Sequence, residues 1–556
     1  MNKSHCYYRF PGNGRLVAGL TCFSSLLLVL LVSACAPATD PPAPELPAMP
    51  ITELSLAAPP TETDDGLRLA PPTPSWDGYG EAVAVHNDVL VIGASEWNPC
   101  GPGSAYVYRF ADGEWQAEAH LMAGDRDAFG QQALQFQSQR FGSSVAVAGD
   151  LIAVGAPGNT YPAAGDYVGA VYLFEYDGQT WLETAKVTPD PPDIDRLPPP
   201  PGGPAICSRT QRHSFGARVA LDGETLAVAV HPGGDSGSNL VYIYQREAAE
   251  WQVQARLPVP DLPERDLHLV SMSLFGDTLA LSAFYARPEP QENPFSLLSG
   301  SVTVYVFERA GAGWEERYRF VPDAGEVDYL FLNEVNIGAS VALSGADGRA
   351  ELLAVGLPGF PDWSETRDHM MAFGPISDPD RPGMPVSNRQ AGSVFLFERS
   401  EEGHWQPQVT LVGAGWQNPP GPGTLFAEPP PTPAEETESS GADGFSAAAG
   451  FPESIVFPGH ILSAEPEISF FGATVDLDGD RLAVTAGFAN ATYLFERGEE
   501  AWVYRSKFTP RREDGGMWED FAQVVAINGN TLLLGTPGEF GNSAHVFSLG
   551  GITHER

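Results

Sequence analysis

Hydrophobic and polar residues alternate in short runs along most of the chain, and the clearest example begins at residue 141. Residues 143–149 (SSVAVAG) alternate with period two, which is typical of a strand with one buried face. A Gly-Asp turn separates them from residues 151–157, and residues 169–175 form a third run rich in β-forming side chains. An Asp-Gly turn then leads to Trp181. The pattern predicts four antiparallel strands, A to D, in chain order.

The same pattern recurs, so that seven units follow one another from about residue 79 to the end of the chain. Repeats of this size with four strands each are typical of propeller blades. The sequence therefore predicts an all-β fold, a seven-bladed β-propeller of four-stranded blades. The units begin at or near Tyr79, Phe141, Phe215, His268, Ile337, Phe471 and Phe521. Six of them place a tryptophan between strands C and D: Trp115, Trp181, Trp251, Trp314, Trp405 and Trp502.

The seventh unit has neither this tryptophan nor a strand D. A propeller whose first and last blades are not joined would leave two open sheet edges. Residues 67–71 (LRLAP) resemble the strand D ends at 186–189 and 507–510. We therefore expect residues near 64–71 to complete the last blade and close the ring, with residues 51–59 as the alternative.

The repeat resembles a known family through two paired motifs. Phe-Gly at 141–142 is followed by Gly-Ala-Pro at 155–157, and close variants stand at 79–80 with 93–95 and at 471–472. Over residues 64–551 the chain therefore resembles FG-GAP (integrin-α-like) repeat proteins. The resemblance implies a β-propeller whose A–B loops bind calcium where they carry the pattern D-x-[DN]-x-D-G-x-x-D.

Most A–B turns of this chain are too short for calcium, which needs several oxygen ligands on a roomy loop. Two segments are weak candidates. Asp476, Asp478 and Asp480 form an acidic run that fits a hairpin better. A longer A–B loop at 344–351 keeps Asp347 and Glu351 but lacks the first two acids. We therefore predict no metal and no cofactor, and keep calcium as the alternative.

The N-terminus has the pattern of an export signal. Three basic residues and no acidic one occur in the first 34, and residues 16–34 are almost wholly apolar or small. The run ends in LVSAC at 31–35, which matches a lipobox. We predict a lipoprotein signal peptide at 1–34, a lipidated Cys35, and a Pro-rich tether over 35–63. An ordinary secretory signal or a membrane span is the alternative.

Charge and cysteine content agree with an extracytoplasmic protein. The chain has 31 basic and 71 acidic residues, a net charge of −40. Without residues 1–34 the net charge is −43, which repels nucleic acid and excludes it as a partner. Cys100 and Cys207 are the two cysteines left after Cys35 is lipidated, and an oxidising compartment favours a disulfide between them. Two unpaired loop cysteines are the alternative.

Long connections concentrate at one end of the predicted ring. The B–C loops at 284–299 and 358–391 and the D–A loops at 189–214 and 413–469 all open onto the same face. Long loops on a rigid scaffold are where binding usually occurs. For the inserted loop at 413–469 we expect partial disorder, because it is rich in Pro, Glu, Ser and Gly.

The loop at 358–391 contains four candidate ligand-contacting residues, Phe360, Trp363, His369 and Phe373. They predict an ordered contact surface, and a disordered loop without a binding role is the alternative. We find no HExxH metal motif and no GxSxG nucleophile elbow. We therefore expect a monomeric, non-catalytic binding or adhesion propeller, anchored to the membrane by its lipid and contacting an unknown extracellular protein or glycan. The alternatives are an extracytoplasmic enzyme acting on polysaccharide and a structural subunit of an envelope assembly.

Overall fold

The computed structural model describes most of the predicted repeat region. The chain divides into two compact units, and every described residue belongs to the larger one, residues 47–443 and 453–556. No helix among the described residues is long and apolar enough to cross a membrane. The described ranges are 61–63, 66–71, 78–95, 103–125, 139–158, 160–161, 166–167, 169–189, 213–232, 240–260, 266–286, 297–311, 313–322, 327–332, 335–336, 339–358, 393–412, 425–428, 459–461, 471–486, 491–498, 501–509, 524–537 and 542–551.

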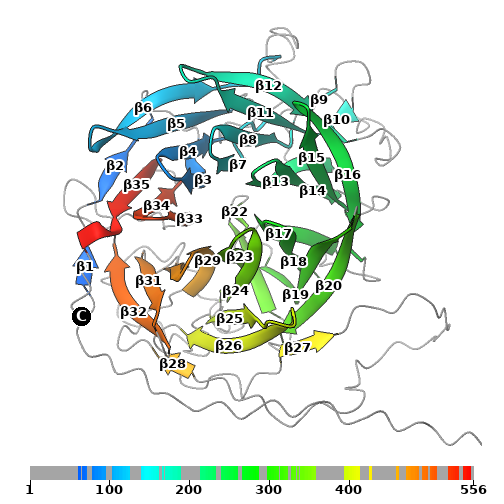
Figure 1. Ribbon diagram of the computed structural model, residues 1–556, viewed down its shortest axis with the longest axis vertical. Coiled ribbons are helices and arrows are strands. Elements are labelled where there is room, and N and C mark those ends of the chain that lie inside the picture. The colour runs from blue at the N-terminus through cyan, green and yellow to red at the C-terminus, as the bar shows by residue number, and fades with distance from the viewer. Residues whose placement is uncertain are drawn as a thin grey trace, which may run out of the picture. The chain divides into compact units, whose positions relative to one another are not determined.

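Seven antiparallel four-stranded blades form a ring, which confirms the predicted fold (Figure 1). Blade 1 consists of β3 (Tyr79–His86), β4 (Val89–Ala94), β5 (Ser104–Ala111) and β6 (Glu114–Leu121). Blade 2 consists of β7 (Ser144–Ala148), β8 (Leu151–Ala156), β11 (Ala170–Tyr176) and β12 (Trp181–Val187). Blade 3 consists of β13 (His213–Asp222), β14 (Thr225–Pro232), β15 (Leu240–Glu247) and β16 (Glu250–Pro258). Blade 4 consists of β17 (Asp266–Phe275), β18 (Thr278–Ala286), β19 (Leu297–Ala310) and β20 (Gly313–Pro322).

The C-terminal half supplies three further blades. Blade 5 consists of β23 (Ser340–Ala346), β24 (Arg349–Leu357), β25 (Ser393–Arg399) and β26 (Trp405–Val412). Blade 6 consists of β29 (Phe471–Asp478), β30 (Arg481–Ala486), β31 (Ala491–Arg497) and β32 (Trp502–Phe508). Blade 7 has β33 (Val524–Asn528), β34 (Thr531–Thr536) and β35 (Ser543–Ser548), and its sheet order is β2-β35-β34-β33.

The outer strand of blade 7 comes from the other end of the sequence. β2 (Leu67–Leu69) pairs antiparallel with β35, so that Arg68 lies opposite His545 and Leu69 opposite Ala544. Leu69 is 8% exposed and packs with residues of blades 7 and 1. In Figure 1 the blue strand β2 therefore lies beside the red strand β35.

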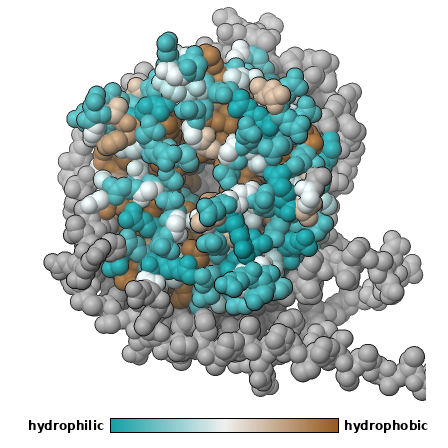
Figure 2. All heavy atoms as spheres, viewed as in Figure 1, coloured by the Kyte–Doolittle hydropathy of each residue, from teal (hydrophilic) through white to brown (hydrophobic). Residues whose placement is uncertain are grey.

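Strand A of each blade lies nearest the axis and strand D at the rim (Figure 1). Strand B has sheet neighbours on both sides and adjacent blades on both faces, so it is a continuous apolar run, as in fully buried strands. β4 and β8 are buried at every position. On the face in view in Figure 2, by contrast, hydrophilic residues predominate and hydrophobic ones form only small areas.

The paired glycines of the repeat motif explain how the blades approach one another. Gly142 has φ 95°, and a Cβ on it would lie 2.1 Å from the carbonyl oxygen of Ser104 in blade 1. A Cβ on Gly93 at the end of β4 would in turn lie 2.0 Å from the carbonyl oxygen of Gly142. The glycine that opens one blade therefore rests against the glycine near the end of strand B in the preceding blade, and any side chain there would separate the two.

Several strands were not expected from the sequence. β1 (Thr61–Thr63) adds to blade 6 beside β32, and β27 (Leu425–Glu428) and β28 (Gly459–Ile461) add to blades 4 and 5. β27 and β28 fall within the inserted segment 413–469. β21 (Val327–Leu332) pairs with β19 and with β22 (Val335–Asn336), and β9 (Thr160–Tyr161) pairs with β10 (Asp166–Tyr167).

The expectation of a longer A–B loop at 344–351 was wrong. β23 ends at Ala346 and β24 begins at Arg349, so the connection is a two-residue turn. Asp347 and Gly348 both have positive φ, 51° and 72°, as a type I′ hairpin turn requires. A bulge between Ser344 and Gly345 takes up the residue that made the segment look long.

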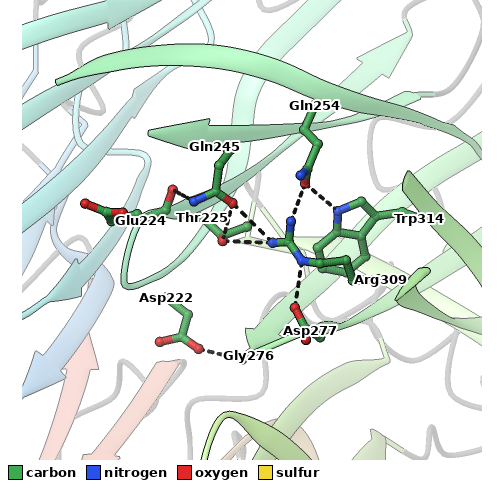
Figure 3. A network of polar contacts seen from close by, with 9 residues as sticks. All are labelled: Asp222, Glu224, Thr225, Gln245, Gln254, Gly276, Asp277, Arg309 and Trp314. Carbon is green, nitrogen blue, oxygen red and sulfur yellow. Dashed lines mark hydrogen bonds and ion pairs between the residues drawn. The ribbon is translucent and has the colours of Figure 1, made fainter. Parts of the chain in front are cut away.

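Neighbouring blades are also joined at the ends of their strands C. There an acceptor side chain of one blade binds an arginine of the next blade. Arg246 pairs with Glu175 at 2.7 Å, and Arg399 pairs with Glu308 at 2.7 Å. Arg497 pairs in the same way with Glu398. In Figure 3 Arg309 binds Gln245 of the preceding blade, as well as Asp277 and Gln254, and Gln254 also accepts the indole N–H of Trp314. These four contacts join blades 2 to 6 in one direction around the ring.

Candidate functional site

A group of charged and polar side chains lies where strands A of blades 1 to 3 begin. This is the end of the ring at which the B–C and D–A connections lie, because strand B ends and strand C begins there too. We call the group the axial cluster. It consists of Glu81, Ser95, Arg140 and Arg218, with Gln139 and Ser143 close to Arg140 in the sequence.

Arg140 is held in a conformation that other side chains rarely adopt. Its φ is 52°, in the left-handed region, and its carbonyl oxygen accepts a hydrogen bond of 3.1 Å from Ser143 N–H. Blade 1 makes the same turn with Gly78, at φ 68°, whose carbonyl oxygen accepts from Glu81 N–H at 3.0 Å. Glycine adopts this conformation without strain, whereas a non-glycine residue there costs about 1 kcal/mol. An arginine is therefore not what the turn itself requires.

Glu81 connects the first two blades within the cluster. One oxygen of its carboxylate accepts a hydrogen bond from the hydroxyl of Ser95, which is 2% exposed. The other oxygen lies 3.3 Å from Nη2 of Arg140. The side chains of Glu81 and Arg140 are only 14% and 22% exposed, so the ion pair is shielded from bulk water. Residue Ser143 occupies the corresponding position of blade 2.

Arg218 brings a second guanidinium to the cluster from blade 3. Its Nε donates to the carbonyl oxygen of Val270 in blade 4 at 2.7 Å, and Nη1 donates to that of Ala217 at 2.8 Å. The pKa of Arg218 is lowered to about 10, chiefly by burial; Glu81 opposes this shift and Arg140 adds to it. The charge is still present at neutral pH. Within the part of the chain that the structure describes, no carboxylate forms an ion pair with it.

Blades 2 and 5 place a serine at the position of Arg218. In blade 2 the Oγ of Ser144 donates to the carbonyl oxygen of Gly216 in blade 3 at 2.7 Å. In blade 5 the Oγ of Ser340 accepts from Val475 N–H in blade 6 at 3.0 Å. A serine is thus sufficient to join two blades, and Arg218 adds a charge that the joint does not need.

Two further polar atoms of the cluster lack a partner. Oε1 of Gln139 and Oγ of Ser143 are buried and make no hydrogen bond to the residues that the structure describes. Gln139 is 4% exposed. Buried polar atoms are nearly always hydrogen-bonded, so these two call for a water molecule or a ligand group.

The acidic run at the opposite end of blade 6 has a structural role instead. The carboxylate of Asp476 accepts from the backbone N–H groups of Leu477 and, in blade 7, Ile527, at 2.9 and 2.7 Å. That of Asp478 accepts from Gly529 N–H of blade 7 at 2.5 Å. The side chain of Asp480 is 71% exposed. The run forms a hairpin, as its spacing favoured, and its two inner carboxylates join blade 6 to blade 7.

The other calcium candidates are also placed. Asp347 lies in the two-residue turn of blade 5, and Glu351 is the exposed extra residue of the adjacent bulge. Across the described ranges, no group of three or more His, Cys, Asp or Glu side chains is arranged to hold a metal ion.

Several predicted site residues lie outside the described residues. These are Cys35, Cys100, Cys207, Phe360, Trp363, His369 and Phe373. The lipid anchor, the disulfide and the aromatic contact surface therefore stay predictions.

Sequence reasoning missed Glu81, Arg140 and Arg218. Each lies within two residues of a repeat motif: Glu81 ends YGE, Arg140 begins RFG and Arg218 ends FGAR. At each of these positions a sister blade has glycine or another small residue. That departure from the repeat template was the available signal.

Comparison with known proteins agrees with the architecture. Residues 135–174 match the FG-GAP repeat family, so the chain contains at least one such repeat within a seven-bladed propeller. No curated protein matches the sequence.

Solved structures to which the chain shows some similarity include the WD40 repeats of RRP9, at 11% identity and TM-score 0.39 over 85% of this chain and 94% of that one. A polysaccharide lyase of family PL25, an ulvan lyase, gives 10% identity and TM-score 0.39 over 87% and 94%. The periplasmic gluconolactonase of Pseudomonas aeruginosa gives 11% and 0.36 over 77% and 84%.

Proposed function

We propose that the protein is a non-catalytic binding propeller that is held outside the cytoplasm by a lipid on Cys35. In this proposal the end with the B–C and D–A loops binds an extracellular ligand. The observation that supports it is the axial cluster. Three charged residues of that end, Glu81, Arg140 and Arg218, stand where sister blades fold with Gly78, Ser143 or Ser144. Side chains that the fold does not require, placed together on three blades, are suited to recognition.

Binding can be tested with the soluble chain, residues 36–556, immobilised and exposed to a glycan array and to solubilised cell-surface proteins. We expect retention of a specific ligand that a heat-unfolded sample does not retain. If neither set yields a ligand, or if the protein cleaves the bound glycan, the proposal of a non-catalytic binding protein is wrong.

The anchor has its own test. Cys35→Ser removes the thiol through which the lipid is attached in the predicted lipobox. We expect metabolic labelling with radioactive palmitate to fall to background, and the protein to accumulate uncleaved or in a soluble fraction. Cys22→Ser, which changes a cysteine inside the apolar stretch, is the control and keeps the label. Undiminished labelling of Cys35→Ser would disprove lipidation at this residue.

A further inference from the structure

We infer that β2 forms an acid-sensitive closure of the ring, in which protonation of His545, opposite Arg68, releases β2 from β35. The ring is closed between blades 7 and 1 at neutral pH and opens there in acid. This device is independent of the proposed binding function. Three features of blade 7 support it: a departure from the repeat, the surroundings of His545 and the way in which β2 is attached.

Strands C and D of the blades share a pair of opposed side chains. In blades 2, 3 and 4 a basic group of strand D lies over a tyrosine ring of strand C, 5.0 to 5.6 Å from its centre. A cation is attracted to the face of a neutral aromatic ring, so the pair favours contact between the two strands. In chain order the opposed residues are Tyr106 and His120, Tyr172 and Lys186, Tyr242 and Arg256, Tyr305 and Arg319, Phe395 and Thr410, Tyr493 and Lys507, and in blade 7 His545 and Arg68.

Blade 7 departs from this repeat because its aromatic residue can itself take up a proton. Tyrosine stays neutral at neutral and acidic pH, whereas an unperturbed histidine is protonated below about pH 6.5. Neutral His545 lies opposite Arg68 as the tyrosines lie opposite their basic partners. Protonated His545 places a second positive charge there, and like charges directly opposite one another on paired strands are destabilising. The repulsion therefore acts on the pairing that holds β2.

The side chains placed around His545 on its own sheet carry no charge apart from Arg68. His545 is 3% exposed, and the Oγ of Ser543 lies 3.2 Å from its Nε2. Leu534 lies opposite it on β34. The pKa of His545 is lowered to about 4, chiefly by burial, and Arg68 adds to the shift. The closed ring therefore favours the neutral form.

Blade 6 packs on the face of blade 7 that carries His545. Phe547, two residues along and so on the same face of β35, contacts the ring of Phe508 with 5.0 Å between the ring centres. The charged neighbour of Phe508, Lys507, lies on the other face of β32, opposite Tyr493. Blade 1 packs on the other face of blade 7, in a cluster with Ala544 and Val546. The charge that meets a protonated His545 is therefore that of Arg68.

β2 can leave blade 7 while β35 stays in place. In the other blades strand D follows strand C through a turn, as β12 follows β11, so that the two strands stay together. β2 instead comes from the other end of the sequence and is three residues long, with Leu67 47% exposed and Leu69 8% exposed. Short segments with few buried contacts open locally at low free energy.

Proton binding favours the open ring. Release of β2 removes part of the burial of His545 and takes Arg68 away from it, so the open form binds the proton more tightly. Because the pKa is lowered in the closed ring, the stabilisation of β2 is fully present above about pH 6.5 and is lost as the pH falls towards 4. The ratio of closed to open rings should fall by up to about a hundredfold over this interval.

Amide hydrogen exchange, followed by mass spectrometry of peptides, measures release of β2 separately from global unfolding. The sample is the soluble chain, residues 36–556, at pH values from about 7 to about 4, with each rate divided by the intrinsic rate at that pH. Protection of residues 64–70 is compared with that of β16, the outer strand of blade 3. His545→Tyr copies the tyrosine of sister blades, and His120→Gln, at an exposed position of blade 1, is the control for loss of a histidine.

For the wild type and His120→Gln we expect protection of residues 64–70 to fall by up to about a hundredfold in acid while that of β16 stays constant. In His545→Tyr β2 should stay protected throughout. Protection of β2 that does not depend on pH, a fall that persists in His545→Tyr, or an equal fall in β16 would overturn the inference. If thermal unfolding shows that His545→Tyr does not fold at neutral pH, His545→Gln takes its place and the same outcomes decide.

Discussion

Removal of β2 is expected to lower the free energy of unfolding by about 3 kcal/mol or more, and to leave a protein that aggregates. β2 provides the outer strand of blade 7, and its Leu69 is buried between blades 7 and 1. Burial of one leucine contributes about 1.5–3 kcal/mol, and the strand removed also leaves the backbone of β35 unpaired along one edge.

A matched pair of truncations isolates this effect. A chain beginning at residue 65 lacks β1 but keeps β2, whereas a chain beginning at residue 72 lacks both. Chemical unfolding should give the first truncated chain a free energy of unfolding close to that of the full soluble chain, and the second a much lower one. Light scattering should detect oligomers only for the second. Equal stability of the two truncated chains would show that β2 does not hold the ring together.

Two buried groups near blade 7 are expected to give stability opposite dependences on pH. Burial lowers the pKa of His545 to about 4, and Arg68 on the closing strand lowers it too. Since an unfolded histidine titrates near 6.5, neutral His545 contributes stability that is lost as the pH falls from about 6.5 towards 4. Burial instead raises the pKa of Asp476 to about 7, assisted by Asp478 and opposed by its two backbone N–H partners.

For Asp476 the sign is reversed. Its unfolded pKa is near 4, so the protonated form contributes stability at low pH that is lost as the pH rises towards 7. Each effect is on the order of a few kcal/mol, and in the wild type they oppose one another over the same interval.

Single substitutions should separate the two effects. Relative to the wild type, His545→Gln should gain stability as the pH falls from 6.5 to 4, and Asp476→Asn should gain stability as it rises from 4 to 7. Urea unfolding at a series of pH values measures both differences, and the exposed Asp480→Asn serves as control. Differences from the wild type that stay constant across this interval would contradict both assignments.

The blades could be predicted because each is specified locally. Alternation along 143–149, a hairpin turn and a tryptophan such as Trp181 are short-range signals, and sevenfold repetition strengthens them. The segment 344–351 was interpreted as a longer A–B loop, because a bulge adds a residue to a strand and the sequence does not distinguish this from a longer loop. β27 and β28 are three or four residues long, and pair only because the folded ring presents edges to them.

The axial cluster could not be assembled from the sequence. Glu81, Arg140 and Arg218 are separated by 59 and 78 residues, and nothing local indicates that they meet. Their proximity follows from the ring, which brings the beginnings of successive strands A to one axis. Only comparison between blades, position by position, shows that these residues depart from what the fold needs.

The pairing of an acceptor in one blade with an arginine in the next gives blades 3 to 5 the same contact on both sides. Each of them has an acceptor for its successor, in Gln245, Glu308 or Glu398, and an arginine for its predecessor. A duplicated blade inserted in this part of the ring would meet a complementary neighbour on both sides. Blade 7 has Ser548 and Leu549 at these two positions and is closed by a distant strand. This contact would therefore stay complete if a blade were duplicated in the middle of the chain, whereas the seam has no such contact to repeat.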